Sequence, residues 1–564
     1  MFTLLTTLLF AGCSASSDPL QPYDKRYTEI MVRLGAAERD TARNVRNKEA
    51  RQRRTDAESA RIAFLRDEGL SRAIEQARAE DDAFTQLKAD AYARERQIHT
   101  VWTEEEKKRE NHLLAKLEEI GSQEASWSSP DGAVQISLNQ SWADAARESE
   151  GLSERSRQIL FEEFIHVRMQ VVGETMQQLV TLRNQVAQRA GYDNYWTLSL
   201  AEHGLTDDQV MAFIGELRTI VDPLNASRQV RLADSAKVVG LAVDAANQPL
   251  LVQWSGQISP DADLDSYFDA DMAEERIVTA FREMGVPADS WQIYTEPRRY
   301  ARAGAYGYPI RPPNTVAIVI SQDRRWSTWQ YEALAHEGAH AVWWQSLPDN
   351  QAASPPLWSP PAPWGEGFAG FFERLTVEES FTTRYLPDLP PALRKIARER
   401  RVQDVADRLT DGIIDAMVEK RLYEQPEDLV ALTDYAAGLR AEMTGMPRPP
   451  TDERGLHYAP ALLSGLTWIY PGYSANFLYA YATECQLFEA VTSQLGDPVA
   501  NAQVGPMLRE RIIQADPTVP IPERIAALLP EQPQTAALQR YFAPLLEAPR
   551  IIALPDETAE NTSR

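Results

Sequence analysis

The sequence predicts a mainly α-helical protein with two lobes and one small antiparallel β-sheet. Its 564 residues exceed the usual size of a single domain, which favours two lobes or two domains. Long segments rich in Ala, Glu, Arg, Lys and Gln favour helices. Only residues 298–320 carry convincing strand signals. Hydrophobic residues make up 43% of the chain, which is enough for a large core.

The net charge of the chain indicates which classes of partner it can bind. The net charge of −24 at pH 7 argues against a nucleic-acid partner, because phosphate binding needs a basic surface. An acidic surface of this kind mainly keeps a protein soluble. We expect a monomer.

The N-terminus resembles a bacterial lipoprotein signal. The apolar run "MFTLLTTLLFAGC" is shorter than the roughly 20 residues of a membrane span, and it ends in small residues before Cys13. This resemblance implies a signal peptide over 1–13, a lipidated Cys13 and a tether over 14–25. We therefore expect an exported protein that contacts the membrane only through Cys13, at the outer membrane or in the periplasm. The alternative is a start codon placed upstream of a buried helix.

The two cysteines do not organise the fold. Cys13 and Cys485 are far apart, so a disulfide framework is excluded. Cys485 lies in the apolar run "YAYATECQLFEAV", which predicts a buried free thiol.

The predicted helices follow in order along the chain. Residues 26–120 are highly charged and predict two or more long helices that could serve as a lid. Residues 152–240 continue the helical pattern with a break at "AGYDNYW", and Thr206 or Asp207 can cap the helix that follows. Further helices are expected over 370–445 and, with many aromatic residues, near 473–495, and a disordered tail is expected over 551–564.

The predicted sheet lies just before the longest apolar helix. "RRYARAGAYGYPI" (298–310) and "TVAIVI" (315–320) flank the turn "RPPN", which favours an antiparallel pair. Ser321 or Asp323 can then cap a helix over about 325–346.

That helix contains the motif that carries chemistry, His336-Glu337-Gly338-Ala339-His340. Four residues apart on a helix, His336 and His340 leave the same face and can share one Zn²⁺ ion. Glu337 lies beside them and can act as the general base for the attacking water. A glycine inside a helix costs about 1 kcal/mol relative to alanine, so we expect a neighbour to pack closely against Gly338.

A catalytic zinc ion keeps three protein ligands, and Glu366 is the candidate for the third. It lies thirty residues after His336 and begins a helical pattern after the proline-rich loop 355–363. Glu373 is two turns further along the same face, where it can hydrogen-bond a ligand imidazole from behind.

With these motifs in view, the chain resembles the helical gluzincin metallopeptidases, the group of angiotensin-converting enzyme and the thimet oligopeptidase family. Their pattern is HExxH followed by a glutamate that opens a later helix. The segment "LRNQVAQRAGYDNYWTLSLAEHGLTDDQVMAFIGELRTIVDPL" (182–224) is also similar to these families. The resemblance covers a catalytic core over 150–500. It implies a zinc metallopeptidase domain over 26–550, with two helical lobes around a deep central cleft.

The resemblance also implies residues that contact substrate. "ARAGAYG" (301–307) is similar to the edge strand of angiotensin-converting enzyme, which implies that Ala303 and Ala305 pair with the peptide backbone. The position four residues after the zinc glutamate, an aspartate in that enzyme, is Gly370 here, which leaves Glu373 to orient the histidine.

A donor for the developing oxyanion is expected in "WIYPGYSANFLYAY" (468–481), which resembles the tyrosine segment of these families. Tyr473 is the first choice, and Tyr470 and Tyr479 are alternatives. Trp468 lies where the families place a histidine, and His457 is the histidine nearest to this segment in the sequence.

Together these features predict zinc-dependent hydrolysis of peptide bonds in short oligopeptides, by an oligopeptidase or a peptidyl-dipeptidase. Two alternatives remain open at this point. One is a zinc carboxypeptidase of similar fold, and the other is a non-catalytic, peptide-binding lipoprotein of the cell envelope.

Overall fold

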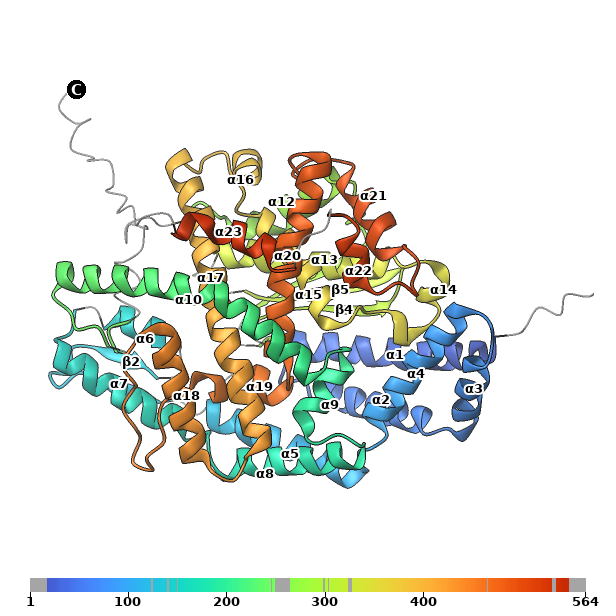
Figure 1. The fold of residues 1–564 in the computed structure, drawn as a ribbon, viewed down its shortest axis with the longest axis horizontal. Coiled ribbons are helices and arrows are strands. Elements are labelled where there is room, and N and C mark those ends of the chain that lie inside the picture. Colours follow the sequence, from blue (N-terminus) through green and yellow to red (C-terminus); the bar gives the residue numbers. More distant parts are fainter. Residues whose placement is uncertain are drawn as a thin grey trace, which may run out of the picture.

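The computed structural model describes residues 18–122, 125–138, 142–149, 151–244, 246–248, 264–297, 300–302, 304–322, 327–463, 465–529 and 534–546. These residues form a mainly helical molecule, as predicted, and they contain two small sheets where one was predicted (Figure 1). The predicted signal peptide 1–13 and the predicted tail 551–564 lie outside the described residues. Within them, no helix is both long and apolar enough to cross a membrane.

The charged N-terminal region folds into five helices: α1 (Gln21–Arg43), α2 (Lys48–Leu65), α3 (Glu68–Arg78), α4 (Ala83–His99) and α5 (Glu104–Ser122). Side chains of Asn47, Asp67 and Asp82 accept backbone N–H groups at the starts of α2, α3 and α4, which explains why the region breaks there.

The predicted tether over 14–25 is wrong in its second half. Helix α1 begins at Gln21, and both Leu20 and Asp24 are buried. Asp24 accepts hydrogen bonds from Lys88 (2.6 Å) and Tyr92 (2.8 Å) of α4, so this part of the chain is anchored in the fold.

Two large hydrophobic cores correspond to the two predicted lobes. The first core gathers residues of α5, α6 (Trp142–Glu148), α7 (Glu154–Met169), α8 (Glu174–Arg189), α9 (Tyr195–Glu202), α10 (Asp207–Val239), α18 (Leu429–Thr444), α19 (Gly465–Ile469) and α23 (Ala536–Leu546). The second core gathers residues of α12 (Ala273–Glu283), the larger sheet, α13 (Ser327–Gln345), α14 (Asp349–Ala352), α15 (Ala362–Leu375), α16 (Glu379–Tyr385), α21 (Val504–Leu508) and α22 (Ile521–Ala526).

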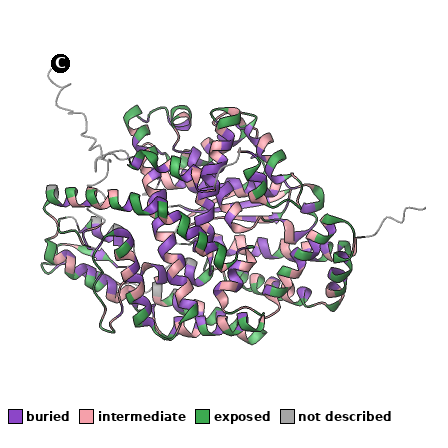
Figure 2. Cartoon of the chain, viewed as in Figure 1, coloured by how far each residue is buried: buried purple, intermediate pink, exposed green. Residues whose placement is uncertain are grey.

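Two long helices belong to both cores. Helix α17 (Pro391–Glu424) gives Ile396 to the second core and Val405 to the first. Helix α20 (Tyr473–Leu495) gives Leu478 to the first core and Leu487 to the second. Both helices run through the middle of the molecule (Figure 1), where buried residues concentrate (Figure 2).

The larger sheet contains β3 (Trp291–Pro297), β4 (Ala305–Arg311) and β5 (Thr315–Gln322) in the order β3-β5-β4. Strands β4 and β5 form the predicted antiparallel pair around the turn 312–314. Strand β3 was not predicted and pairs with β5 in parallel, so this sheet is mixed. A second unpredicted sheet is the short antiparallel pair β1 (Ser126–Ser128) and β2 (Gln135–Ser137).

The central strand β5 is buried on both faces. Val316, Ile318 and Ile320 face the second core with α13, whereas Ala317 and Val319 pack with Ala42 of α1. Ser321 lies within β5 and bonds the backbone of Gly304, so its prediction as a helix cap is wrong. Asp323, the other candidate cap, lies outside the described residues.

Three local predictions are confirmed. Thr206 caps α10 and forms a capping box with Gln209. Cys485 is a buried free thiol. A Cβ atom at Gly338 would lie 2.9 Å from the ring of Trp291, so the expected close neighbour is the first residue of β3.

Candidate metal centre

The two motif histidines lie on one face of α13. Their ring centroids are 5.0 Å apart, and each side chain is 17% exposed. The helical spacing of four residues alone accounts for this proximity.

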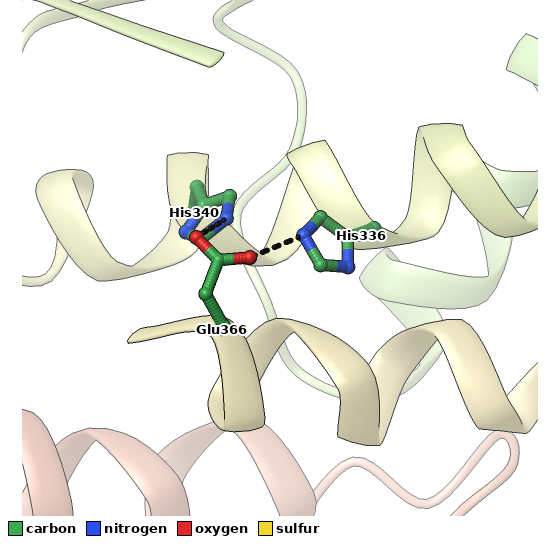
Figure 3. A group of neighbouring side chains, drawn as sticks. All are labelled: His336, His340 and Glu366. Atoms are coloured by element: carbon green, nitrogen blue, oxygen red, sulfur yellow. Dashed lines mark hydrogen bonds and ion pairs between the residues drawn. The ribbon is translucent and has the colours of Figure 1, made fainter. Parts of the chain in front are cut away.

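Helix α15 brings Glu366 to the same point from the opposite side (Figure 3). One carboxylate oxygen of Glu366 lies 3.1 Å from Nε2 of His336, and the other lies 3.7 Å from Nε2 of His340. Ligand atoms of these three residues all lie within 4.8 Å of one another. Two imidazoles and one carboxylate are the donor set that a catalytic zinc ion takes, so the residues fit the metal.

Glycines in α15 let this helix approach α20 closely. A Cβ atom at Gly367 would lie 2.4 Å from the side chain of Thr483, and one at Gly370 would lie 2.8 Å from Glu484. Gly370, the position of an aspartate in angiotensin-converting enzyme, therefore serves helix packing here.

Behind the histidine pair lies a buried ionic network. Glu373 accepts a hydrogen bond from Nδ1 of His336 over 2.9 Å. Arg401 of α17 pairs with Glu373 through one terminal nitrogen, and its other terminal nitrogen lies 3.3 Å from Glu484. The network fixes the ring of His336 from the side away from Glu366.

The electrostatics of the centre favour a cation. Burial alone would lower the pKa of His336, but hydrogen bonds to Glu366 and Glu373 raise that pKa well above its ordinary value. Burial alone would raise the pKa of Glu366, but the two histidines hold it well below its usual range. The carboxylates thus stabilise positive charge at this point.

Glu337 points from the same helix toward strand β4. It is 8% exposed and accepts a hydrogen bond from the backbone N–H of Gly307. Burial raises its pKa, although the two histidines act in the opposite direction. A buried carboxylate with a raised pKa beside the histidine pair suits a general base.

Of the two predicted substrate-binding alanines, Ala305 begins β4 and Ala303 lies outside the described residues. Strand β4 is at an edge of its sheet. Backbone groups two residues apart in a strand point to the same side. The N–H of Gly307 points to Glu337, so the backbone N–H and C=O of Ala305 lie on that same side of the strand.

The structure separates the candidates for the oxyanion donor. The hydroxyl of Tyr473 donates to Glu366 over 2.7 Å, whereas Tyr470 is 43% exposed beside it. The hydroxyl of Tyr479 donates to the carbonyl of Gln209, and the imidazole of His457 bonds the carbonyl of Pro449. Among these four residues, Tyr473 is the one that contacts a candidate metal ligand.

One residue of the centre was missed from the sequence. His203, at the C-terminal end of α9, meets the ring of Tyr473 edge-on at a centroid distance of 6.0 Å. Burial lowers its pKa to about 4, although the charge of Glu366 acts in the opposite direction. Its ring forms no hydrogen bond with any residue that the structure describes. The one sequence feature that could have pointed to His203 is its position directly before Gly204, inside the segment 182–224 that resembles the metallopeptidase families.

No family model matches the sequence, and no curated protein matches it either. Among solved structures, an X-ray structure of a protein provisionally assigned as an oligoendopeptidase F matches with a TM-score of 0.68. The match covers 94% of this chain and 93% of that one at 14% sequence identity. The two proteins share one fold.

The shared fold extends over nearly the whole chain. Because so little of the chain is left outside the match, the N-terminal helices belong to the shared fold. At 14% identity the likeness concerns the fold alone, and the chemistry has to be argued from the residues of the metal centre.

Proposed function

We propose that the protein is a zinc-dependent peptidase that cleaves short oligopeptides, as an oligopeptidase or a peptidyl-dipeptidase. The convergence of His336, His340 and Glu366, with Glu337 beside them, carries this proposal. The fold shared with a provisionally assigned oligoendopeptidase F supports it.

His336, His340 and Glu366 would hold the metal, and Glu373 keeps the ring of His336 in place. A zinc ion bound there supplies a Lewis acid that lowers the pKa of water and polarises a carbonyl group. The carboxylate of Glu337 accepts the proton of the attacking water and passes it to the nitrogen of the leaving amine.

The peptide backbone pairs with the free edge of β4 at Ala303 and Ala305, as an added strand. The hydroxyl of Tyr473 then turns from Glu366 to the carbonyl oxygen on which negative charge develops.

The decisive experiment combines metal analysis with cleavage of a set of quenched fluorescent peptides. We expect one zinc ion per chain and a loss of about 10²–10⁴-fold in turnover for Glu337→Gln, with the zinc content unchanged. The exposed Glu379→Gln on α16 is the matched control and should cleave normally. Stoichiometric zinc without cleavage of any peptide would indicate a non-catalytic peptide-binding protein instead. Release of single C-terminal residues would identify a carboxypeptidase.

We also propose that Cys13 carries a lipid that anchors the exported protein to the cell envelope. Radiolabelled palmitate should enter the wild-type chain and should not enter Cys13→Ser. Equal labelling of the two chains would refute the anchor and would leave the peptidase proposal untouched.

A further inference from the structure

A large cavity, here called the side chamber, adjoins the metal centre. Its volume is about 1180 Å³. Its walls come from α4, the start of α10, the proline-rich segment 355–361 and residues 517–522. Sites for small molecules usually measure about 300–1,000 Å³, so the side chamber is large enough for part of a polymer.

Three residues of the side-chamber lining lie next to residues of the metal centre, either in contact or along the chain. His203 lines it and also contacts the ring of Tyr473. Trp364, two residues before Glu366, is another lining residue. Pro309 of β4, two residues after Gly307, is a third. A peptide held along β4 at the metal therefore has the side chamber beside it.

The walls are largely apolar. They include Phe213, Trp343, Trp358, Trp364 and Tyr479, together with prolines from both proline-containing segments. Their rings and pyrrolidines offer surface that gains free energy when apolar groups displace water from it.

The charges of the lining side chains nearly balance, with Arg61, Arg94 and Arg524 against Asp90, Glu95, Glu202 and Glu216. Arg61 pairs with Glu95, and Arg524 donates to the backbone carbonyls of Val519 and Ile512. Asp90 and Arg94 of α4 are exposed. The wall charges therefore give no strong preference for a charged ligand.

We propose that the side chamber holds bulky apolar side chains of the bound peptide on one side of the cleaved bond, with the main chain passing His203. The inference rests on the proposed peptidase function and specifies its substrate class. Because the imidazole of His203 has no hydrogen-bond partner among the described residues, it is free to bind a main-chain amide or carbonyl group.

The substrate class is tested with uncharged eight-residue quenched peptides of Ser and Gly in which a Leu-Phe pair is moved along the chain. A Ser-Asn pair at the same positions provides the reference peptides. When the Leu-Phe pair lies on one side of the cleaved bond, kcat/KM should be at least about tenfold higher than with the Ser-Asn pair at the same positions. The reason is that burial of each apolar side chain contributes substantially to binding free energy. Equal kcat/KM for both pairs at every position would overturn the inference.

Filling the cavity links this preference to the side chamber. Ala212 of α10 is exposed and lines the cavity, so Ala212→Trp should fit without disturbing the core. This variant should lose the preference for Leu-Phe and keep its activity on the Ser-Asn peptides. Ala226→Trp, at an exposed position of the same helix outside the cavity lining, is the matched control and should retain the preference.

Binding to the zinc-loaded full chain carrying Glu337→Gln separates this inference from the proposed function. By calorimetry, the Leu-Phe peptide should bind at least about tenfold more tightly than the Ser-Asn peptide, and adding Ala212→Trp should abolish the difference. That result supports the side chamber even if the wild-type chain cleaves neither peptide. Equal affinities, or the same loss with Ala226→Trp, would overturn the inference even if both peptides are cleaved.

Discussion

Glu419 of α17 is a buried carboxylate that holds the turn before Tyr473. One of its oxygens accepts the N–H of Gly472 over 2.7 Å, and Gly472 adopts a left-handed conformation with φ +75°. Its other oxygen is buried and has no hydrogen-bond partner within the described residues. Burial raises the pKa of Glu419 to about 8, so the carboxyl is largely protonated at neutral pH.

This raised pKa makes stability depend on pH. Between an unfolded pKa of 4.5 and a folded pKa of about 8, the folded chain binds more protons at Glu419 than the unfolded chain does. Its contribution is therefore complete below about pH 4.5 and is lost as the pH rises toward 8. Glu419→Gln keeps the acceptor for Gly472 and does not ionise. Relative to wild type, the free energy of unfolding of this variant should increase by on the order of 1 kcal/mol for each pH unit between the two pKa values.

Thermal melts of both proteins at pH 5, 6, 7 and 8 measure this difference. Glu379→Gln, which changes an exposed carboxylate, should give no trend with pH. Melting curves of Glu419→Gln that run parallel to wild type at every pH would contradict the assignment.

Arg401 is the second residue whose role can be tested singly. Its side chain is 3% exposed and pairs with Glu373, which bonds His336. Removing such support behind a ligand typically costs 10–100-fold in metal affinity, so we expect a loss of about that size for Arg401→Lys, which keeps the charge but not the planar fork. Chelator competition measures the zinc dissociation constant.

Arg408 provides the control for this variant. It lies 3.6 Å from the same carboxylate but is 48% exposed, so Arg408→Lys should leave the affinity nearly unchanged. Unaltered zinc affinity in Arg401→Lys would show that the network serves packing alone.

At the scale of single residues, the sequence identifies those that share a local pattern. His336, Glu337 and His340 follow from helical periodicity, and Glu366 follows from its place at the start of the next helix but one. His203 could not be found in this way. It lies 270 positions before Tyr473, and only packing between the ends of α9 and α20 brings the two rings together.

At the scale of elements, the packing of α13 against β3 is a close one that can be tested. The ring of Trp291 occupies the space beside Gly338, and Gln345 holds its indole N–H over 2.7 Å, so the ring cannot move aside easily. Gly338→Ala should therefore destabilise the protein by about 1–3 kcal/mol despite the better helix propensity of alanine.

Gly215 of α10 is the matched control, because a Cβ atom there meets no other atom within 4 Å. Gly215→Ala should stabilise the protein by about 0.4–1 kcal/mol. Chemical unfolding of both variants measures the two changes in free energy of unfolding. A Gly338→Ala variant as stable as the wild type would contradict the packing argument.

The strands show why elements differ in predictability. Strand β5 is buried on both faces and so reads as a continuous β-branched run. Strand β3 lies at a sheet edge, and its sequence WQIYTEP mixes polar and apolar residues without a clear alternation. Its pairing in parallel with β5 depends on a long connection that local patterns do not reveal.

At the scale of the whole molecule, α17 and α20 join the two cores, and the N-terminal helices form a small core of their own against this body. Each large core combines segments from distant parts of the chain, so the sequence indicates two lobes but not their composition. Helix α4 and the segment 355–361 form parts of the same side chamber, which makes the lid role of the N-terminal helices testable.

Hydrogen exchange in the presence of a zinc-binding peptide inhibitor tests that lid. We expect slower exchange in α4 and in 355–361, because closing the side chamber removes their amides from water. Helix α7, which contributes no residue to the chamber lining, should be unchanged. Protection confined to α13 and α15 would show that the N-terminal helices are a fixed wall.

The free edge of β4 has a consequence for the behaviour of the protein in concentrated solution. An exposed strand edge is a template on which other chains can add and aggregate. Here the edge lies beside the metal centre, and α1 packs across the strand, with Gly35 close to Pro309. We expect this crowding to admit a slender peptide more readily than the strand of a neighbouring folded molecule. The arrangement that would admit a peptide thus also protects the protein against self-association through its own sheet.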